Sequence, residues 1–359
     1  MADFTSPADK LLNWYRRHKR NLPFRESGDP YRIWVSEIML QQTRVDQMLP
    51  YYHRFIEAFP TVHDLAKADQ QNVLRLWEGL GYYSRARNLH AAAKQVVDCY
   101  DGKLPESKEE LQKLKGIGPY TSAAIASIAF NQPFPVVDGN VERVIARYKG
   151  IESDLRKQET KKIIKHATGE MISAEYPGDF NQAVMELGAT ICTPKNPDCN
   201  LCPLSDECIA YKNVRTETVP YKSPAKKRPH HEIGIGIIRG DDEKLLIAKR
   251  PDDAMLGGLW EFPGGKQKQQ ESIEETVARE LHEELGVEVE VEQPFMKLNH
   301  GYSHFTVTLQ AYLCRIKSGS PKPNSSTEIK WVSIEELSEY PFPKANRKLT
   351  EALQNRLLI

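Results

Sequence analysis

The stretch from Leu114 to Val144 constrains the fold most, because two closely spaced glycines must turn the backbone directly before a helix. Gly116 and Gly118 bracket one apolar residue, and an Ala- and Ile-rich helix is expected over 122–130. Glycines here would let the backbone N–H groups at the helix N-terminus approach a phosphate, where the helix dipole favours an anion. A tight connection without a ligand would use the same residues, so the motif alone leaves both interpretations open.

Asp138 follows this helix in a Val-Asp-Gly-Asn sequence, eighteen residues beyond Tyr120. Asp-Gly is a common turn pair, so the residue alone says little. A phosphate-binding hairpin followed by one acidic residue is, however, one way to hold a nucleic-acid backbone and carry out chemistry beside it. The rest of the chain decides between these interpretations.

The first half of the sequence has helical periodicity, and no strand is expected in it. Pro50 is expected to mark a helix start. The expected helical segments are 8–20, 31–59, 62–67, 70–77, 88–100, 122–130, 141–148, 158–172 and 180–190. The first half should therefore be an all-α domain.

Glu37 lies within an apolar helical pattern, where a carboxylate is costly to bury without a partner or a purpose. It is either a solvated helix position or a desolvated carboxyl with a raised pKa, able to donate a proton near neutral pH. Gln41, Gln42 and Thr43 are expected to follow on the same helix. Such uncharged groups can read base edges, and the alternative is ordinary helix surface.

A glycine-flanked turn follows, in which Gly79 and Gly81 enclose Leu80. The turn is expected to expose Tyr82 or Tyr83 at its tip. An aromatic side chain on such a loop could wedge between bases, whereas the alternative is a tyrosine of the core.

Four of the six cysteines gather near the end of the helical half, with the spacing Cys192-x6-Cys199-x2-Cys202-x5-Cys208. In a chain without an export signal, such a cluster indicates metal binding before disulfides. Zinc sites usually place roughly twelve to twenty residues between two cysteine pairs. Four closely spaced thiolates therefore favour one [4Fe–4S] cluster, with zinc as the alternative.

Charge and hydropathy restrict the partners and the compartment. The chain has 49 Lys and Arg against 49 Asp and Glu, so its net charge is zero. Residues 1–228 carry 33 basic and 28 acidic side chains (+5), and the remainder 16 and 21 (−5); the basic first part weakly supports a nucleic-acid surface. No run of about 18 apolar residues and no leader are recognised, so a cytoplasmic protein is expected.

The periodicity changes after a basic, proline-containing linker over 213–229. Alternating patterns predict strands over 231–239, 244–249, 287–292, 296–304 and 305–316. Between them, Glu280, Glu283 and Glu284 are spaced to share one helical face and could hold a divalent cation. The second domain should be α/β, which makes the chain multidomain.

The segments WVSEIMLQQT, LKGIGPYTS and VVDGNV, together with the cysteine spacing, resemble the helix-hairpin-helix DNA glycosylases, and among them the adenine DNA glycosylases of the MutY type. The resemblance runs from about residue 8 to the end, because that family carries a C-terminal Nudix-like domain. It implies a helical glycosylase half over 1–212, in which a module of about 23–132 is inserted between 1–22 and a cluster-bearing lobe over 133–212. It also implies a Nudix-like 8-oxoguanine-recognition domain over 230–359.

The resemblance further implies removal, in base-excision repair, of adenine mispaired with 8-oxoguanine or guanine in duplex DNA, by a protein that we expect to be a monomer. Glu37 matches the acid that protonates adenine at N7, and Asp138 matches the carboxylate that stabilises the oxocarbenium-like sugar. Tyr120 stands where bifunctional relatives such as endonuclease III have a lysine, so strong lyase activity is not expected. Tyr120 and Asn140 match residues that support the catalytic aspartate.

Other positions match the family's base-recognition residues. Phe24 replaces the usual tryptophan of the adenine pocket, and Tyr302 replaces the phenylalanine of the hairpin that inspects 8-oxoguanine. The matching positions for DNA and base binding are Arg20, Arg25, Gln42, Thr43, Leu80, Tyr82, Gly116, Gly118, Gln182, Tyr302, Ser303 and His304.

Every position of the Nudix signature is filled in this chain, although that signature is often degraded in the family. The second domain is therefore either a scaffold that only recognises the lesion, which we favour, or a nucleotide pyrophosphohydrolase that retains a metal. A catalytically idle lesion-binding protein is a third class, against which Glu37 and Asp138 argue.

Overall fold

The computed structural model describes residues 6–225 and 227–356, and the chain divides into two compact units. Helices α4 (Val45–Ala58) and α7 (Ser84–Tyr100) contribute residues to both. Among the described residues, none of the helices has the length and apolar character needed to cross a membrane. The first unit lies within Met1–Met48, Ala58–Ala66 and Ala91–Ala225, and the second within Leu49–Glu57, Lys67–His90 and Lys226–Ile359.

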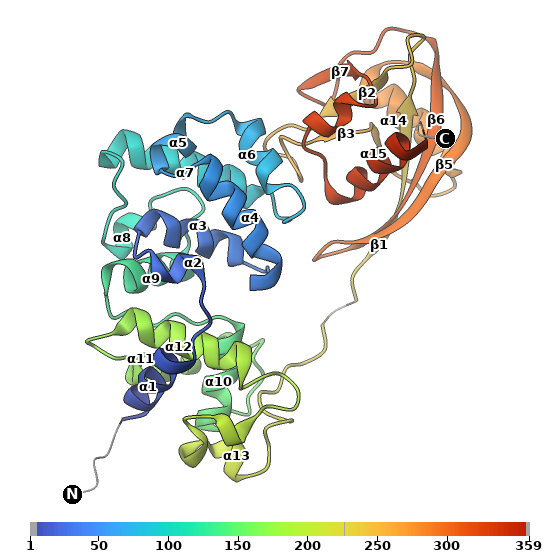
Figure 1. Ribbon diagram of the computed structural model, residues 1–359. Helices are drawn as coiled ribbons and strands as arrows, with labels where there is room; N and C mark the ends of the chain where they lie inside the picture. Colours follow the sequence, from blue (N-terminus) through green and yellow to red (C-terminus); the bar gives the residue numbers. More distant parts are fainter. Residues whose placement is uncertain (1–5, 226, 357–359) are drawn as a thin grey trace, which may run out of the picture. The chain divides into compact units, whose positions relative to one another are not determined.

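The first unit is helical. Its α1 begins after the N-cap Ser6, whose hydroxyl accepts a hydrogen bond from the Asp9 N–H at 3.2 Å. Four of its helices, α1, α10, α11 and α12, share one apolar core (Figure 1). The helices are α1 (Pro7–His18), α2 (Pro23–Glu26), α3 (Pro30–Leu40), α5 (Val62–Lys67), α8 (Lys108–Leu111), α9 (Pro119–Phe130), α10 (Gly139–Lys149), α11 (Gln158–Met171), α12 (Pro177–Thr190) and α13 (Ile209–Lys212), with 3₁₀ turns at Cys199–Leu201 and Ser205–Glu207.

The expected all-α character of the first half is confirmed, since no strand occurs in the described residues before His230. Two details of the expectation are wrong. Pro50 lies inside α4 and does not begin it. A proline there removes one backbone hydrogen bond, and α4 retains its place because Met48, Tyr52 and Phe55 are fully or almost fully buried. The segment 41–43 is a turn and not part of a helix, because α3 ends at Leu40.

The second unit contains α6 (Gln70–Trp77) and a domain of two sheets. The four-stranded sheet has the order β4-β1-β6-β5, in which β1 and β6 run parallel, and the three-stranded sheet has the order β3-β2-β7. Helices α14 and α15 pack on the strands (Figure 1). The bounds are β1 (His230–Ile238), β2 (Leu245–Lys249), β3 (Trp260–Glu261), β4 (Gly264–Lys266), α14 (Ile273–Leu285), β5 (Glu288–Gly301), β6 (Thr306–Ser318), β7 (Glu328–Val332), a 3₁₀ turn at Glu336–Glu339 and α15 (Lys344–Arg356).

Glycines on β1 let α14 approach the sheet closely. A Cβ at Gly236 would lie 2.5 Å from a methyl carbon of Leu281, and one at Gly234 would lie 2.8 Å from Val277. The α/β expectation is confirmed by this packing. The two strands expected over 287–292 and 296–304 form one strand, β5, whose register shifts near Pro294, and the strand ends at Gly301.

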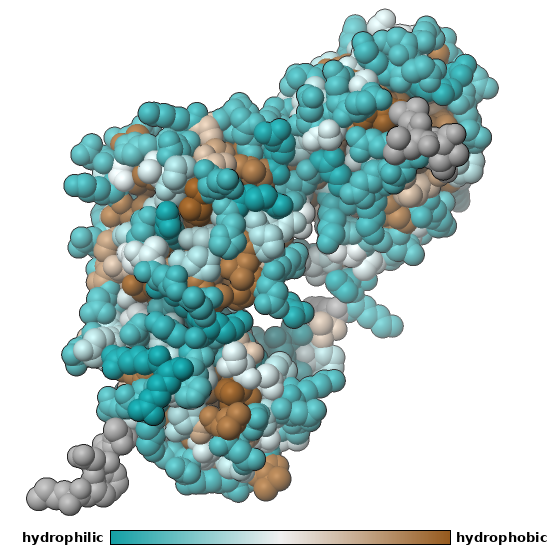
Figure 2. All heavy atoms as spheres, in the orientation of Figure 1, coloured by the Kyte–Doolittle hydropathy of each residue, from teal (hydrophilic) through white to brown (hydrophobic). Residues whose placement is uncertain are grey.

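The surface in view is mostly hydrophilic, with hydrophobic side chains exposed in the region of α13 (Figure 2). Leu201, Ile209 and Val214 are 62%, 44% and 92% exposed. All three lie in or beside the short helical turns of the cysteine segment. These turns are too short to bury their own apolar side chains.

Candidate active site

One cleft of about 1100 Å³ lies in the first unit, between α2, α3, α9, α10 and α12. It gathers most of the residues that the sequence nominated for catalysis and base binding. Those in its wall are Arg20, Arg25, Glu37, Gln42, Thr43, Gly116, Gly118, Tyr120, Asp138, Asn140 and Gln182, together with Phe24. Glu37 and Asp138 therefore share one cavity, although about a hundred residues separate them in the chain.

Glu37 lies on α3 and is only 7% exposed. Among the residues that the structure describes, none donates a hydrogen bond to its carboxyl. Burial and, to a smaller extent, the charge of Asp138 raise the pKa of Glu37, the charge of Arg25 lowers it, and the resulting pKa is about 7. A carboxyl with this pKa is half protonated at neutral pH and can donate a proton into the cleft. The desolvated interpretation of Glu37 is thus the one that the structure supports.

Asp138 has the opposite kind of environment, since hydrogen bonds hold its carboxylate. It is the N-cap of α10 and accepts from the Val141 N–H at 2.8 Å through Oδ1. Its Oδ2 accepts from Asn140 Nδ2 at 3.1 Å. Burial raises the pKa of Asp138, and the hydrogen bonds from Val141 and Asn140 counteract that shift. The carboxylate is fixed in orientation at the start of a helix.

Asn140 is itself held by Arg143, which the sequence did not nominate. Arg143 Nη2 donates to Asn140 Oδ1 at 2.9 Å and to the Gly188 carbonyl at 2.6 Å, and its Nε donates to the Cys192 carbonyl at 2.7 Å. A Cβ at Gly188 would lie 2.6 Å from the Asn140 Cβ. The signal for Arg143 was its helical spacing from Asn140 on the segment after Asp138.

The glycine hairpin leads into α9 as expected. Gly116 has φ 81°, which favours glycine, and Gly118 is the N-cap of α9 without a side-chain cap. A Cβ at Gly118 would meet nothing within 4 Å, so the space beside this helix start is open. Tyr120, on the first turn, contacts Met185 Sδ through its hydroxyl at 3.9 Å. Burial raises the pKa of Tyr120 well above its usual range, as do the charges of Glu37 and Asp138.

The polar turn after α3 lines the cleft from another side. Gln42 has φ 57°, and the Thr43 N–H donates to the Leu40 carbonyl at 3.1 Å. Gln41 Nε2 donates to Thr121 Oγ1 at 3.0 Å, which ties the turn to α9. The helix assignment for these residues was wrong, yet a turn presents Gln42 and Thr43 to the cleft.

Glu186 on α12 is a residue of the cleft that the sequence analysis missed. It is fully buried and accepts hydrogen bonds from both Arg20 and Arg25. It lies four residues after Gln182 in an apolar run, so helical spacing places both on one face. That spacing was the available signal.

The four clustered cysteines are partly buried and form no disulfide. Burial and the neighbouring thiols of Cys192 and Cys208 raise the pKa of Cys199. Arg147 Nη1 donates to Cys192 Sγ at 3.4 Å and to the Thr193 carbonyl at 2.6 Å. In the described part of the chain, no three His, Cys, Asp or Glu side chains converge on a position for one metal ion.

The remaining recognition candidates lie in the second unit. Leu80 is buried, whereas Tyr82 is 39% exposed and Tyr83 only 3%, so Tyr82 is the exposed tyrosine of the turn. The Tyr82 hydroxyl hydrogen-bonds with Ser303 Oγ. Tyr302, Ser303 and His304 form the hairpin between β5 and β6, as the family resemblance implied, and the strand expected over 296–304 ends at Gly301.

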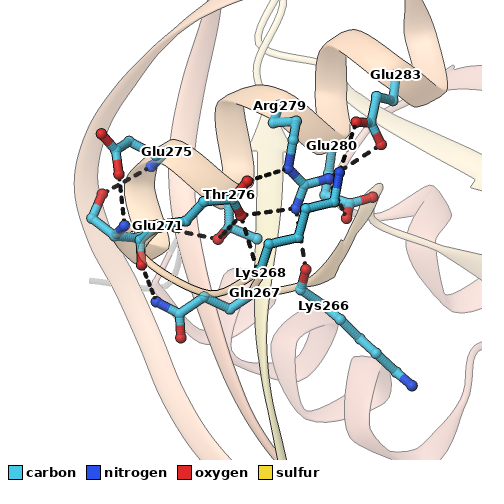
Figure 3. A network of polar contacts seen from close by, with 10 residues as sticks. Lys266, Gln267, Lys268, Glu271, Glu275, Thr276, Arg279, Glu280 and Glu283 are labelled. Atoms are coloured by element: carbon cyan, nitrogen blue, oxygen red, sulfur yellow. Dashed lines mark hydrogen bonds and ion pairs between the residues drawn. The ribbon is translucent and has the colours of Figure 1, made fainter.

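The acidic residues of α14 are engaged with a cation of the chain itself (Figure 3). Arg279 donates to Glu271 at 2.6 and 3.0 Å, to Glu280 at 2.8 Å and to Glu283 at 3.2 Å. The hydrogen bond from Arg279 lowers the pKa of Glu271 to about 2. Glu284 instead accepts from the Gly264 N–H at 3.1 Å, and burial raises its pKa to about 7. Arg279 thus pairs with Glu280 and Glu283 on the helical face that the sequence suggested for a divalent cation, whereas Glu284 lies against the backbone of Gly264.

The fold and the cleft correspond to known protein families. Residues 35–169 match the family of HhH-GPD superfamily base excision DNA repair proteins, and residues 234–352 match the NUDIX domain. A solved thermostable thymine-DNA glycosylase is 27% identical with a TM-score of 0.51, covering 57% of this chain and 95% of its own. The protein is therefore a base excision DNA glycosylase with a helix-hairpin-helix core, followed by a Nudix domain.

The particular family follows from closer relatives. An adenine DNA glycosylase of Mus musculus is 33% identical over 97% of this chain and 78% of its own length, and that of Homo sapiens is 32% identical over 99% and 75%. An adenine DNA glycosylase of Buchnera aphidicola is 32% identical over 95% and 96%. The chain belongs to the adenine DNA glycosylases, which hydrolyse an N-glycosidic bond in base-excision repair.

Proposed function

We propose that this glycosylase removes adenine mispaired with 8-oxoguanine or guanine, using Glu37 as the acid and Asp138 as the carboxylate that stabilises the oxocarbenium-like sugar. The observation that supports it is a single cleft with one protonatable, unpartnered carboxyl and one hydrogen-bonded carboxylate. Adenine first leaves the base stack, which a mispair makes less costly. The Glu37 carboxyl then gives its proton to adenine N7, so that the C1′–N9 bond breaks and neutral adenine departs.

The sugar left behind carries positive charge at C1′, and the Asp138 carboxylate stabilises it until water attacks that carbon. Asn140 keeps Asp138 in position for this step. Position 120 is a tyrosine, so the cleft offers no amine there for a Schiff base. We expect a monofunctional enzyme that leaves an abasic site and does not cut the strand.

Recognition of the mispair is assigned to both units. Gly116 and Gly118 bind the DNA backbone, while Arg20, Arg25 and Gln182 contact the flipped adenine. The opposite base is read by Gln42, Thr43, Leu80, Tyr82 and the hairpin of Tyr302, Ser303 and His304. The Nudix-like domain over 230–359, after a linker over 213–229, acts as a recognition domain in this proposal and not as a pyrophosphohydrolase.

A [4Fe–4S] cluster held by Cys192, Cys199, Cys202 and Cys208 would order the loop that carries Lys195 toward DNA phosphates. The cluster would supply a rigid cross-link between thiolates that are far apart in the loop. Visible absorbance and iron and sulfide analysis of the purified protein test the assignment. Zinc without sulfide would overturn it.

A single-turnover assay on a duplex with one adenine opposite 8-oxoguanine tests the activity. The wild type should produce abasic sites that alkali converts to strand breaks, whereas Asp138→Asn should produce almost none while still binding the duplex. Glu37→Gln should likewise bind and not cleave. Full activity in either variant would remove that carboxylate from the mechanism.

The pyrophosphohydrolase alternative has its own assay. Full-length wild type and a Glu283→Gln/Glu284→Gln variant are incubated with Mg²⁺ and 8-oxo-dGTP. We expect no difference in phosphate release between the wild type and the variant, because Arg279 already forms ion pairs with Glu280 and Glu283. Release by the wild type alone would assign this second activity.

A further inference from the structure

Glu186 occupies an unusual position in the cleft, because it is a fully buried carboxylate between two guanidinium groups. It accepts from Arg20 Nε at 2.6 Å, from Arg20 Nη2 at 2.9 Å and from the Arg20 N–H at 3.1 Å. It also accepts from Arg25 Nη2 at 2.8 Å. Burial alone would raise the pKa of Glu186, but the hydrogen bonds from Arg20 and the charge of Arg25 hold it at about 2. Glu186 is therefore ionised throughout the neutral range.

Arg25 depends on this carboxylate for its position. It lies on α2, a helix of four residues, and its side chain is 10% exposed. Its guanidinium carbon lies 5.6 Å from the centre of the Tyr15 ring. Its Nη1 is buried and makes no hydrogen bond within the described chain, a condition that is generally unfavourable. Arg25 also lines the cleft, so the ion pair with Glu186 fixes a cation in the cleft wall.

Arg25 also acts on the proton donor. The charged and titratable groups that face Glu37 come from three neighbouring elements, and they are Arg25 on α2, Tyr120 on α9 and Asp138 at the start of α10. Those that face Glu186 are Arg20, Arg25 and Tyr15. Arg25 is the one cation in the first set, and Glu186 is its ion-pair partner. The net charge beside Glu37 at Arg25 thus depends on whether Glu186 is ionised.

We propose that Glu186 is a positioning residue for adenine excision: it fixes Arg25 in the wall of the cleft and balances the guanidinium charge, and this balance lets Glu37 keep its proton although a cation lies beside it. This inference rests on the proposed role of Glu37 as the acid. Glu186 need not touch the base, because it acts through Arg25. Arg20 provides a second cation that keeps Glu186 ionised when Arg25 contacts the substrate.

The pH dependence of the excision rate tests this proposal. Glu186→Gln preserves the size of the side chain and removes its charge, so the uncompensated Arg25 favours the ionised form of Glu37. The limb on which single-turnover excision falls as pH rises should move to lower pH by about one unit, which is about a tenfold loss at pH 8 and little loss at pH 5.5. Arg25→Gln should move the same limb to higher pH, because Glu37 loses the cation that lowers its pKa.

A charge-conserving variant and a direct measurement of the Glu37 protonation state complete the test. Glu186→Asp retains the charge and should retain the midpoint of the wild type, even where its rate is lower. The carboxyl stretch of Glu37, isolated by infrared difference against Glu37→Gln in protein without DNA, should show the same shifts in midpoint. Because this readout needs no turnover, it tests the inference even if the wild type fails to excise adenine, which would refute the proposed function alone.

A purely structural role predicts a different result. The rate of Glu186→Gln would then fall by the same factor at every pH, with an unchanged midpoint in both assays, and the proposal would be overturned. If Glu186→Gln does not fold, as judged by helical circular dichroism, Arg25→Gln decides alone, since that variant leaves Glu186 paired with Arg20. An unchanged or lowered midpoint in Arg25→Gln would refute the proposal.

Discussion

Replacing Glu37, the proposed catalytic acid, should stabilise the protein at alkaline pH, because burial raises the pKa of this carboxyl. The pKa of this carboxyl is raised from 4.5 to about 7 in the folded state. Between these values the folded state binds more protons than the unfolded state, so the free energy of unfolding falls as pH rises and levels off above the folded pKa. The difference of about 2.5 pKa units corresponds to roughly 3 kcal/mol lost by pH 8 relative to pH 4.

Glu37→Gln cannot ionise and should escape this loss. Its amide adds an offset that is the same at every pH, so the informative quantity is the change in the difference between variant and wild type. Urea unfolding followed by helical circular dichroism at pH 5, 6, 7 and 8 measures it. The variant should gain roughly 2–3 kcal/mol on the wild type between pH 5 and pH 8.

The control is Glu159→Gln, which changes the charge equally at an exposed position of α11. Its difference from the wild type should stay within about 0.5 kcal/mol across the series. A flat difference for Glu37→Gln, or one that shrinks as pH rises, would refute the claim that burial sets the proton affinity of this carboxyl.

Three further changes probe the surroundings of the site. Gly188→Ala should slow excision about tenfold or more, because its Cβ would lie 2.6 Å from the Asn140 Cβ and displace the amide that donates to Asp138. Duplex binding in a gel-shift assay should change little. An unchanged excision rate would show that Asn140 tolerates movement. Arg147→Met should lose visible absorbance on dilution faster than the wild type, since the buried guanidinium donates hydrogen bonds to Cys192 Sγ and neighbouring carbonyls. Equal loss of absorbance in both proteins would show that Arg147 does not hold the cysteine segment. Tyr120→Lys should give a covalent DNA complex that borohydride traps, whereas no trapped complex would mean that an amine at this position does not reach C1′.

The helical half could be predicted well because its signals are local. Apolar spacing along the chain defined α9, α10 and α12 to within a few residues, and the two glycines placed the start of α9. The errors arose where tertiary packing outweighs a local rule. Pro50 lies within α4 because the apolar residues around it are buried, and the sequence around 41–43 contains no residue that forces α3 to end.

Most residues of the candidate site could be predicted from the sequence, but the contacts between them could not. Glu37 and Asp138 could be nominated because each is an acid in an apolar or glycine-containing context. The ion pairs of Glu186 with Arg20 and Arg25 could not, since they join residues 161 and 166 positions apart. In the same way, the spacing of Glu280 and Glu283 suggested a cation, while the neighbouring Arg279 supplies the positive charge.

The two carboxylates that we propose as catalytic show why identity alone does not assign a role. Both are buried in one cleft, and burial raises the pKa of each. Asp138 caps a helix and accepts a side-chain amide, interactions that favour its charged form, whereas Glu37 faces Asp138 with no hydrogen-bond donor among the described residues. Two like charges in one cavity are costly, so the proton stays on the carboxyl that lacks donors. The cleft therefore separates an acid from an anion through the backbone and side-chain donors around each, and exchanging the donors would exchange the roles.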